Sequence, residues 1–133
     1  MTTEKSILIT GCSTGIGYEA AKQLKARGWR VIATARKAQD RARLERELGV
    51  ETLTLELADM NSIAACAKAA LATTNNKLGA LYNNAAYGQI GAMEDISGEV
   101  LRRHFDINVI GTHELTRLII PAMRVAGGGR IVN

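Results

Sequence analysis

A glycine-rich segment stands at the junction of two regular patterns near the start of the chain. The apolar residues from Ser6 to Thr10 are typical of a short buried strand, and the stretch from Gly15 to Arg27 repeats apolar residues every four positions, as one face of a helix does. Between them lies the sequence TGCSTGIG, Thr10 to Gly17. A strand that turns into a helix through so tight a loop predicts an α/β fold.

The rest of the chain continues this alternation of strands and helices. Further strands are predicted at Arg30 to Ala35, Thr52 to Leu57, Ala80 to Asn83 and Arg130 to Val132. Further helices are predicted between Arg36 and Gly49, after a cap at Asp59 or Asn61, and from about Ser97 to Val125. Repeated alternation favours parallel strands joined by right-handed crossovers, with helices on both faces of the sheet. Without a repeat or a linker, the 133 residues predict one domain over 1–133.

The three glycines of the TGCSTGIG segment suggest a binding function. Gly11 suits the turn, Gly15 lets the backbone approach a ligand closely, and Gly17 lets the helix pack against the strand. The free N–H groups at the start of the following helix would then face a pyrophosphate. The spacing is G-x-x-x-G-x-G rather than G-x-G-x-x-G, and an ordinary tight turn is the alternative.

The end of the second predicted strand bears on which nucleotide binds. An acidic residue about twenty positions after the glycines holds the ribose 2′-hydroxyl of NAD, whereas an arginine there accommodates a 2′-phosphate. Arg36 lies 19 positions after Gly17, between Ala35 and Lys37. It predicts a dinucleotide with the additional phosphate. Alternatively, Arg36 and Lys37 only begin a solvated helix.

Four segments resemble the classical short-chain dehydrogenases/reductases, in order and over the whole chain. They are TGCSTGIG, NNAAYG (Asn83 to Gly88), FDINVIG (Phe105 to Gly111) and the final GRIVN (Gly129 to Asn133). The resemblance implies a Rossmann-type doubly wound parallel sheet with strand order 3-2-1-4-5, truncated after the fifth strand. The chain would be the N-terminal, NADP-binding portion of the family's domain.

The resemblance also assigns roles to individual residues. Ser13, Thr14, Gly15, Ile16 and Gly17 would border the phosphates and ribose of NADP, Arg36 the 2′-phosphate, Glu56 the adenine, and Asn84 and Ala85 the adenosine ribose. Leu57 is a further cofactor-binding candidate. Two positions depart from the family pattern, because Glu56 replaces the usual aspartate and Ala86 the usual glycine. The first puts a hydrogen bond to the adenine in doubt, and the second requires a backbone that avoids positive φ.

Asn108 lies on a predicted stripe of the long helix. Leu101, Phe105, Asn108, Thr112, Leu115, Ile119 and Ala122 follow one another at steps of four and three, so we expect them to face the sheet. A buried amide without partners costs about 1–3 kcal/mol, so Asn108 must bind backbone, water or ligand. It is either a core asparagine or, as the resemblance implies, the catalytic asparagine that holds a water in a proton relay.

The family transfers a hydride between the nicotinamide and a carbonyl or carbinol carbon, using a serine and a Tyr-x-x-x-Lys motif after the fifth strand. Only Tyr18 has a lysine four residues on, Lys22, and it lies beside the predicted phosphate site. The resemblance therefore implies an enzyme at family level and an inactive fragment here, acting on an unidentified small carbonyl or alcohol. The alternative is a non-catalytic NADP-binding or interaction module that ends naturally at residue 133.

Charge, cysteine content and hydropathy bear on the expected partners and location of the protein. The net charge of +4 comes from scattered lysines and arginines without a basic tract, so nucleic acid is not an expected partner. Cys12 and Cys66 lack metal-ligand spacing and predict reduced thiols. Neither a membrane span nor a leader is expected, because Glu4 and Lys5 precede only a short apolar run. These features predict a cytoplasmic protein. An exposed strand at Arg130 to Val132 predicts a homo-oligomer.

Overall fold

The computed structural model describes residues 5–133, and in this range it contains one sheet of five parallel strands. The strands lie in the order β3-β2-β1-β4-β5, as predicted. Their bounds are β1 Ser6–Ile9, β2 Arg30–Ala35, β3 Glu51–Thr54, β4 Ala80–Tyr82 and β5 Arg130–Val132. The first four positions of the predicted domain, with the Glu4 that argued against a leader, lie outside the described residues.

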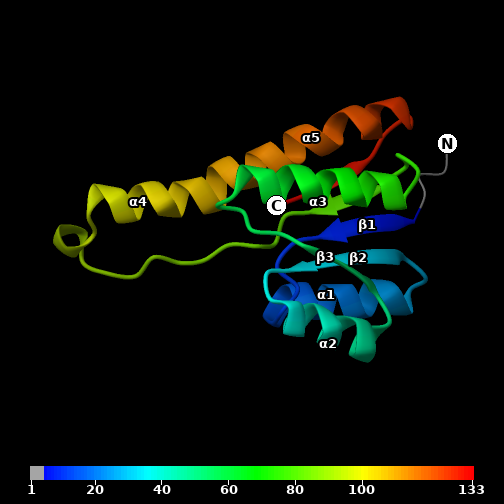
Figure 1. The fold of residues 1–133 in the computed structure, drawn as a ribbon, viewed down its shortest axis with the longest axis horizontal. Helices are drawn as coiled ribbons and strands as arrows, with labels where there is room; N and C mark the ends of the chain where they lie inside the picture. The colour runs from blue at the N-terminus through cyan, green and yellow to red at the C-terminus, as the bar shows by residue number, and fades with distance from the viewer. Residues whose placement is uncertain (1–4) are drawn as a thin grey trace.

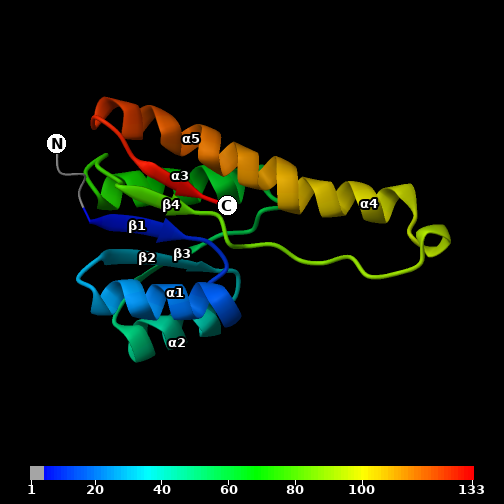
Figure 2. The same ribbon diagram turned by 180° about the vertical axis from the view of Figure 1, so that it is seen from behind.

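Helices cover both faces of the sheet (Figure 1, Figure 2), because each parallel strand needs a crossover to reach the next. Helices α1 and α2 lie on one face, and α3 and α5 lie on the other. The helical segments are α1 Gly15–Ala26, α2 Ala38–Leu48, α3 Met60–Thr73, η1 Met93–Asp95, α4 Gly98–Phe105, η2 Asp106–Gly111 and α5 Thr112–Val125. Asp59 caps α3, since its side chain accepts a hydrogen bond from the Asn61 N–H at 2.9 Å.

The core consists of two apolar layers, one on each side of the sheet. Successive side chains of a strand point to opposite faces, so Leu8 packs with α3 and α5 while Ile7 and Ile9 pack with α1 and α2. Among the described residues, the largest fully buried side chains are leucines and isoleucines with Val31, Thr10 and Thr34, and none is aromatic. This layering places the ends of β1, β2 and β4 between the two helical layers.

Three strands are shorter than predicted at their C-terminal ends. The predicted strands extend to Thr10, Leu57 and Asn83, whereas the observed strands end at Ile9, Thr54 and Tyr82. Thr10 and Asn83 still donate backbone hydrogen bonds, to the carbonyl groups of Tyr82 and Val132. The chain leaves the sheet at these points to form loops at its carboxyl edge.

The predicted helix from Ser97 to Val125 is not uniform, and its predicted stripe is partly wrong. The helix is interrupted by the π-helical segment η2, which shifts the phase of the side chains. Leu115 and Ile119 face the core as expected, but the next buried residue of α5 is Met123 rather than the predicted Ala122. Helix α4 extends beyond the sheet (Figure 1), so Leu101 and Phe105 are exposed.

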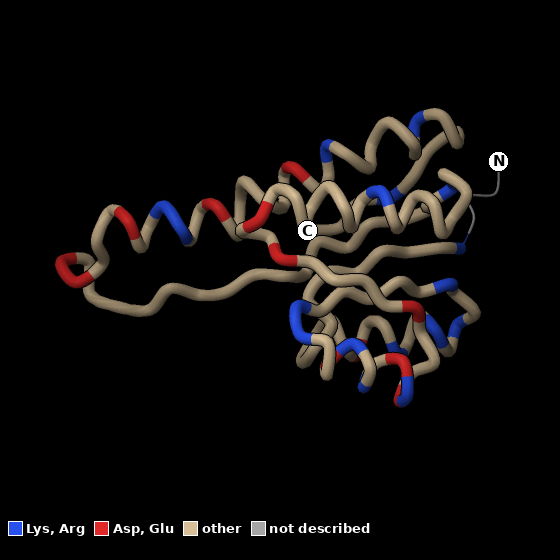
Figure 3. Tube along the Cα trace, viewed as in Figure 1, with Lys and Arg blue, Asp and Glu red and all other residues tan. Residues whose placement is uncertain are grey.

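Surface features bear on the predicted partners. Strand β5 forms one edge of the sheet with all three residues exposed, and Phe105 exposes 52% of its surface on the α4 arm. Self-association through either region stays a prediction. Basic and acidic residues are interspersed along α2 and also occur together on α4 (Figure 3). None of the helices in residues 5–133 combines the length and apolar character needed to span a bilayer.

Candidate nucleotide-binding cleft

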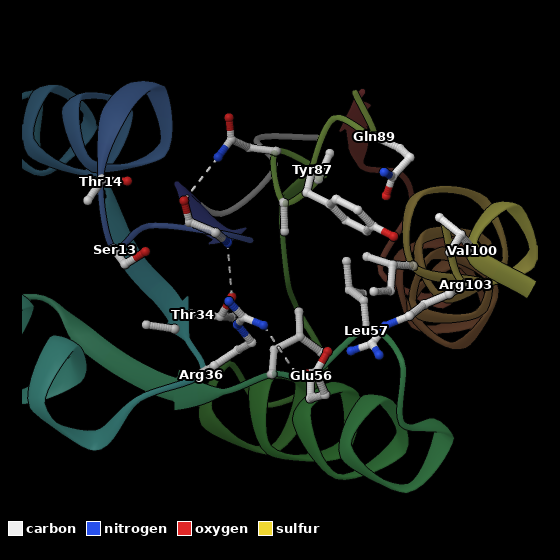
Figure 4. A pocket seen from close by; sticks show the side chains of 17 residues that line it. Ser13, Thr14, Thr34, Arg36, Glu56, Leu57, Tyr87, Gln89, Val100 and Arg103 are labelled. Atoms are coloured by element: carbon white, nitrogen blue, oxygen red, sulfur yellow. Dashed lines mark hydrogen bonds and ion pairs between the residues drawn. The ribbon is translucent and has the colours of Figure 1, made fainter. Parts of the chain in front are cut away.

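A cleft of about 650 Å³ opens at the carboxyl ends of β1, β2 and β4 (Figure 4). The sheet order reverses at β1, because the chain adds β2 and β3 on one side and β4 and β5 on the other. Ligands of open α/β sheets bind at such a switch point. The lining residues are Gly11, Ser13, Thr14, Thr34, Ala35, Arg36, Leu55, Glu56, Leu57, Asn84, Ala85, Ala86, Tyr87, Gln89, Val100, Arg103 and Ile107.

The glycines of the TGCSTGIG loop occupy three different environments. Gly11 has φ +70°, and a Cβ there would lie 2.8 Å from the Cα of Ala85. A Cβ at Gly17 would overlap the carbonyl oxygen of Gly11 and lie 2.5 Å from Nδ2 of Asn84. Gly15 has φ +62° and open space around it. Gly11 and Gly17 therefore permit close packing, whereas Gly15 leaves room for a ligand near the backbone.

In the described chain, the N-terminus of α1 lacks the side-chain cap and the acidic first-turn residue that commonly stabilise a helix start. Its cap residue, Thr14, makes no side-chain capping hydrogen bond, and its first turn contains no acidic residue. In contrast, Ser97 caps α4 by accepting from the Val100 N–H at 3.3 Å. Free N–H groups and the positive end of the helix dipole at α1 favour an anionic ligand.

A buried threonine joins the two loops that form the floor of the cleft. Thr10 is 1% exposed, and its Oγ1 accepts hydrogen bonds from the N–H groups of Asn84 at 3.0 Å and Ala85 at 2.9 Å. In return, Nδ2 of Asn84 donates to the carbonyl oxygens of Thr10 and Gly11, both at 3.1 Å. Asn84 thus holds the glycine loop in place. Sequence reasoning missed Thr10, because a threonine at a strand end gives no distinct signal.

Arg36 and Glu56 line the cleft where the chain leaves β2 and β3. Arg36 Nη1 lies 3.7 Å from Glu56 Oε2, and the arginine side chain remains 71% exposed. Glu56 Oε1 also accepts from the Ala58 N–H at 3.2 Å. The Glu56 carboxylate therefore accepts a hydrogen bond from its own turn and also lies beside Arg36. Ala86 is absent from the positive-φ residues of the described chain, so replacement of the usual glycine requires no strained backbone there.

Arg43 on α2 contacts the glycine loop, although sequence analysis did not single it out. Its Nη2 donates a hydrogen bond to the carbonyl oxygen of Ser13. The guanidinium lies 3.5 Å from Asp40 and 5.8 Å from the centre of the Tyr18 ring. Arg43 therefore positions the loop from outside the cleft. Nothing in the pattern of α2, which is rich in charged residues, distinguishes it from its neighbours.

Asn108 is half-buried and does not line the cleft, although it lies close to a residue that does. Its Oδ1 accepts from the Tyr87 N–H at 3.1 Å, and its Nδ2 donates to the Tyr87 carbonyl oxygen at 2.8 Å. Nδ2 also lies 2.8 Å from Nε2 of His104, whose ring packs edge-on against Tyr87. Asn108 therefore fixes the backbone of Tyr87, and its role in a proton relay stays a prediction.

The structure brings most of the proposed site residues to one place. Gly11, Ser13, Thr14, Arg36, Glu56, Leu57, Asn84 and Ala85 line the same cleft. Gly15 and Ile16 lie at the start of α1 on a shallower hollow, and Gly17 is buried behind the loop. Within residues 5–133, no group of three or more histidine, cysteine, aspartate or glutamate side chains could hold a metal ion.

Cys12 and Cys66 are free, buried thiols. Burial raises the pKa of each to about 12, and at Cys12 a backbone hydrogen bond from Thr34 lowers it only in part. Since the thiolate is the reactive form, both should be inert at neutral pH. We expect iodoacetamide to label the folded chain at pH 8 far more slowly than the chain in guanidinium chloride. The native rate should keep rising with pH above 9, whereas native labelling that levels off near pH 9 would contradict the burial.

A parallel sheet with a glycine loop at its switch point and a cleft above it defines a nucleotide-binding α/β domain of the Rossmann type. The short chain dehydrogenase family model matches residues 5–133. The chain therefore belongs to the short-chain dehydrogenase family of oxidoreductases, as its motifs predicted.

Relatives of known sequence or structure agree with this assignment. The chain is 40% identical over 129 residues to the oxidoreductase YbbO of Escherichia coli K12, covering 97% of this chain and 48% of that protein. A short-chain dehydrogenase structure from Streptomyces avermitilis superposes with a TM-score of 0.90 at 35% identity, over 98% of this chain and 48% of that one. The chain spans about half the length of these relatives.

Two further structures carry different cofactors. An actinorhodin polyketide ketoreductase variant with NADPH is 29% identical, with a TM-score of 0.90 over 98% of this chain and 52% of its own. A 3-ketoacyl-(acyl-carrier-protein) reductase from Brucella melitensis, complexed with NADH, is 28% identical with a TM-score of 0.85. The match covers 95% of this chain and 53% of that one. Family membership thus leaves the choice between NADPH and NADH to the residues of the cleft.

Proposed function

We propose that this chain binds NADP(H) and forms the cofactor-binding part of an oxidoreductase that interconverts a carbonyl and a hydroxyl group on a small molecule. The observation that carries the choice of cofactor is Arg36 at the end of β2. Its guanidinium lines the cleft, and among residues 5–133 its one ion-pair partner is Glu56, at 3.7 Å. A 2′-phosphate could take two charge-assisted hydrogen bonds from this group.

The cleft fits a dinucleotide in charge and shape. The uncapped start of α1 and the open space at Gly15 suit the pyrophosphate, with Ser13, Thr14, Ile16 and the packed Gly11 and Gly17 around it. Leu57 and Ala85 supply apolar walls beside Glu56 and Asn84. Residues 1–133 would thus serve as one NADP-binding domain.

The bound cofactor would supply the hydride, and the chain would bind and orient it. Of the tyrosines, only Tyr18 has a lysine four residues on, but Tyr18 does not line the cleft, and its hydroxyl donates to Glu47 Oε2 of α2 at 3.0 Å. Tyr18 therefore does not supply the family's proton donor. We propose that the 133 residues bind cofactor without turnover, with Asn108 ready to join a relay completed by other residues.

Arg36→Ala tests this choice of cofactor. Hydrogen bonds to charged groups contribute about 1.5–3 kcal/mol, so the Kd for NADPH should rise by about ten- to a hundredfold. The Kd for NADH, which lacks the 2′-phosphate, should change less than about threefold. Isothermal titration of both cofactors measures this.

Lys68→Ala on α3 is the charge-matched control, because Lys68 is exposed and does not line the cleft. This variant should leave both affinities unchanged. Equal losses for NADPH and NADH in Arg36→Ala would show that Arg36 does not distinguish the two cofactors.

A further inference from the structure

A second arginine faces the cleft from the wall opposite Arg36. Arg103 lies on α4 and extends into the cavity toward Leu57, whereas Ser13, Thr14 and Arg36 lie across from it (Figure 4). In the described part of the chain, Arg103 makes no hydrogen bond or ion pair that would occupy its guanidinium. The cleft therefore contains a planar cation whose donors and faces are available to a ligand.

The cleft lining near Arg103 combines apolar side chains with the polar but uncharged Gln89 and the aromatic Tyr87. Val100 and Ile107 lie about one helical turn before and one turn after Arg103 and line the cleft with it, and the buried Leu57, 5% exposed, also lines it. The uncapped N–H groups that suit phosphate lie at the start of α1, on the other side. A flat, uncharged ring fits this end better than a phosphate does, since one face can lie on apolar side chains and the other under a guanidinium.

We propose that Arg103 stacks on the adenine ring of the dinucleotide and is a binding residue for NADPH and NADH alike. This rests on the proposed function, which places a dinucleotide in the cleft. The two arginines then have different roles. Arg36 distinguishes NADPH from NADH by the 2′-phosphate, whereas Arg103 binds the adenine, which both cofactors contain. ADP, which has the adenine without the 2′-phosphate or the nicotinamide, isolates the contribution of Arg103.

Arg103→Met keeps a long apolar side chain and removes the guanidinium. An arginine over an aromatic ring contributes enough that the Kd values for NADPH, NADH and ADP should each rise by about three- to tenfold, and by the same factor. Nicotinamide mononucleotide, which lacks the adenine, should bind both forms equally. Arg102→Met is the matched control, because Arg102 is the neighbouring arginine on α4 but does not line the cleft.

The outcomes separate this inference from the proposed function. Unchanged affinities in Arg103→Met, with Arg36→Ala still selective against NADPH, would overturn the stacking and leave the NADP site standing. A loss confined to NADPH, restored by Arg103→Lys, would instead mean that Arg103 binds the 2′-phosphate, which also overturns it. If the wild-type chain binds none of the three nucleotides, both proposals fail. Thermal unfolding of each variant establishes that a change in affinity is not a loss of fold.

Discussion

Gly17→Ala is expected to lower the free energy of unfolding by about 3–5 kcal/mol and to abolish measurable NADPH binding. The new methyl group would overlap the carbonyl oxygen of Gly11 and lie 2.5 Å from Nδ2 of Asn84. It would therefore enter the hydrogen bond by which Asn84 holds the glycine loop. Backbone on one side and a restrained amide on the other leave little room to relax. Urea denaturation and cofactor titration measure the two effects.

Two other glycine substitutions separate this clash from the general effect of adding a Cβ. Gly98→Ala lies in α4, where the nearest atom would be 3.7 Å away, so stability should stay the same or rise by up to about 1 kcal/mol. Gly15→Ala meets no atom but has φ +62°, so it should cost only about 1–2 kcal/mol. A Gly17→Ala protein as stable as Gly98→Ala would contradict the packing described for α1.

The fold could be predicted because its signals are local and repeated. The apolar run of β1, the four-residue apolar period of α1 and the Asp59 cap each specify an element by themselves. The order of the strands came from the family resemblance and is confirmed. The long helix was harder, because its stripe assumed a constant 3.6-residue period. A π-helical segment changes that period, and the sequence DINVIG carries no mark of it.

The candidate site was predictable only where function leaves an unusual residue. Glycines in the loop and an arginine in place of an acid stand out, so Gly15 and Arg36 could be named from sequence. Thr10 and Arg43 could not, because their importance lies in which distant atoms they reach, the N–H of Ala85 and the carbonyl of Ser13. Arg103 belongs to the same group, since its place on the cleft depends on how far α4 extends beyond the sheet.

Gly111→Ala is expected to be the other strongly destabilising substitution. Gly111 is buried where η2 meets α5, and a Cβ there would overlap the carbonyl oxygen of Leu57 and lie 3.1 Å from its carbonyl carbon. Since both partners are backbone, the helix or the segment after β3 must move. We expect a loss of about 3–5 kcal/mol in the free energy of unfolding, measured by urea denaturation.

If the segment after β3 moves rather than the helix, Gly111→Ala should also change the cleft. Leu57 and Glu56 line the cleft, so displacing their backbone should also weaken NADPH and NADH binding together, by about tenfold or more, in whatever fraction of Gly111→Ala remains folded. Ile110→Ala, at a 46% exposed position of the same segment, is the control and should change stability by less than about 1 kcal/mol. If Gly111→Ala binds both cofactors normally once folded, the helix moves rather than the segment after β3, and the adenine end of the cleft does not depend on η2.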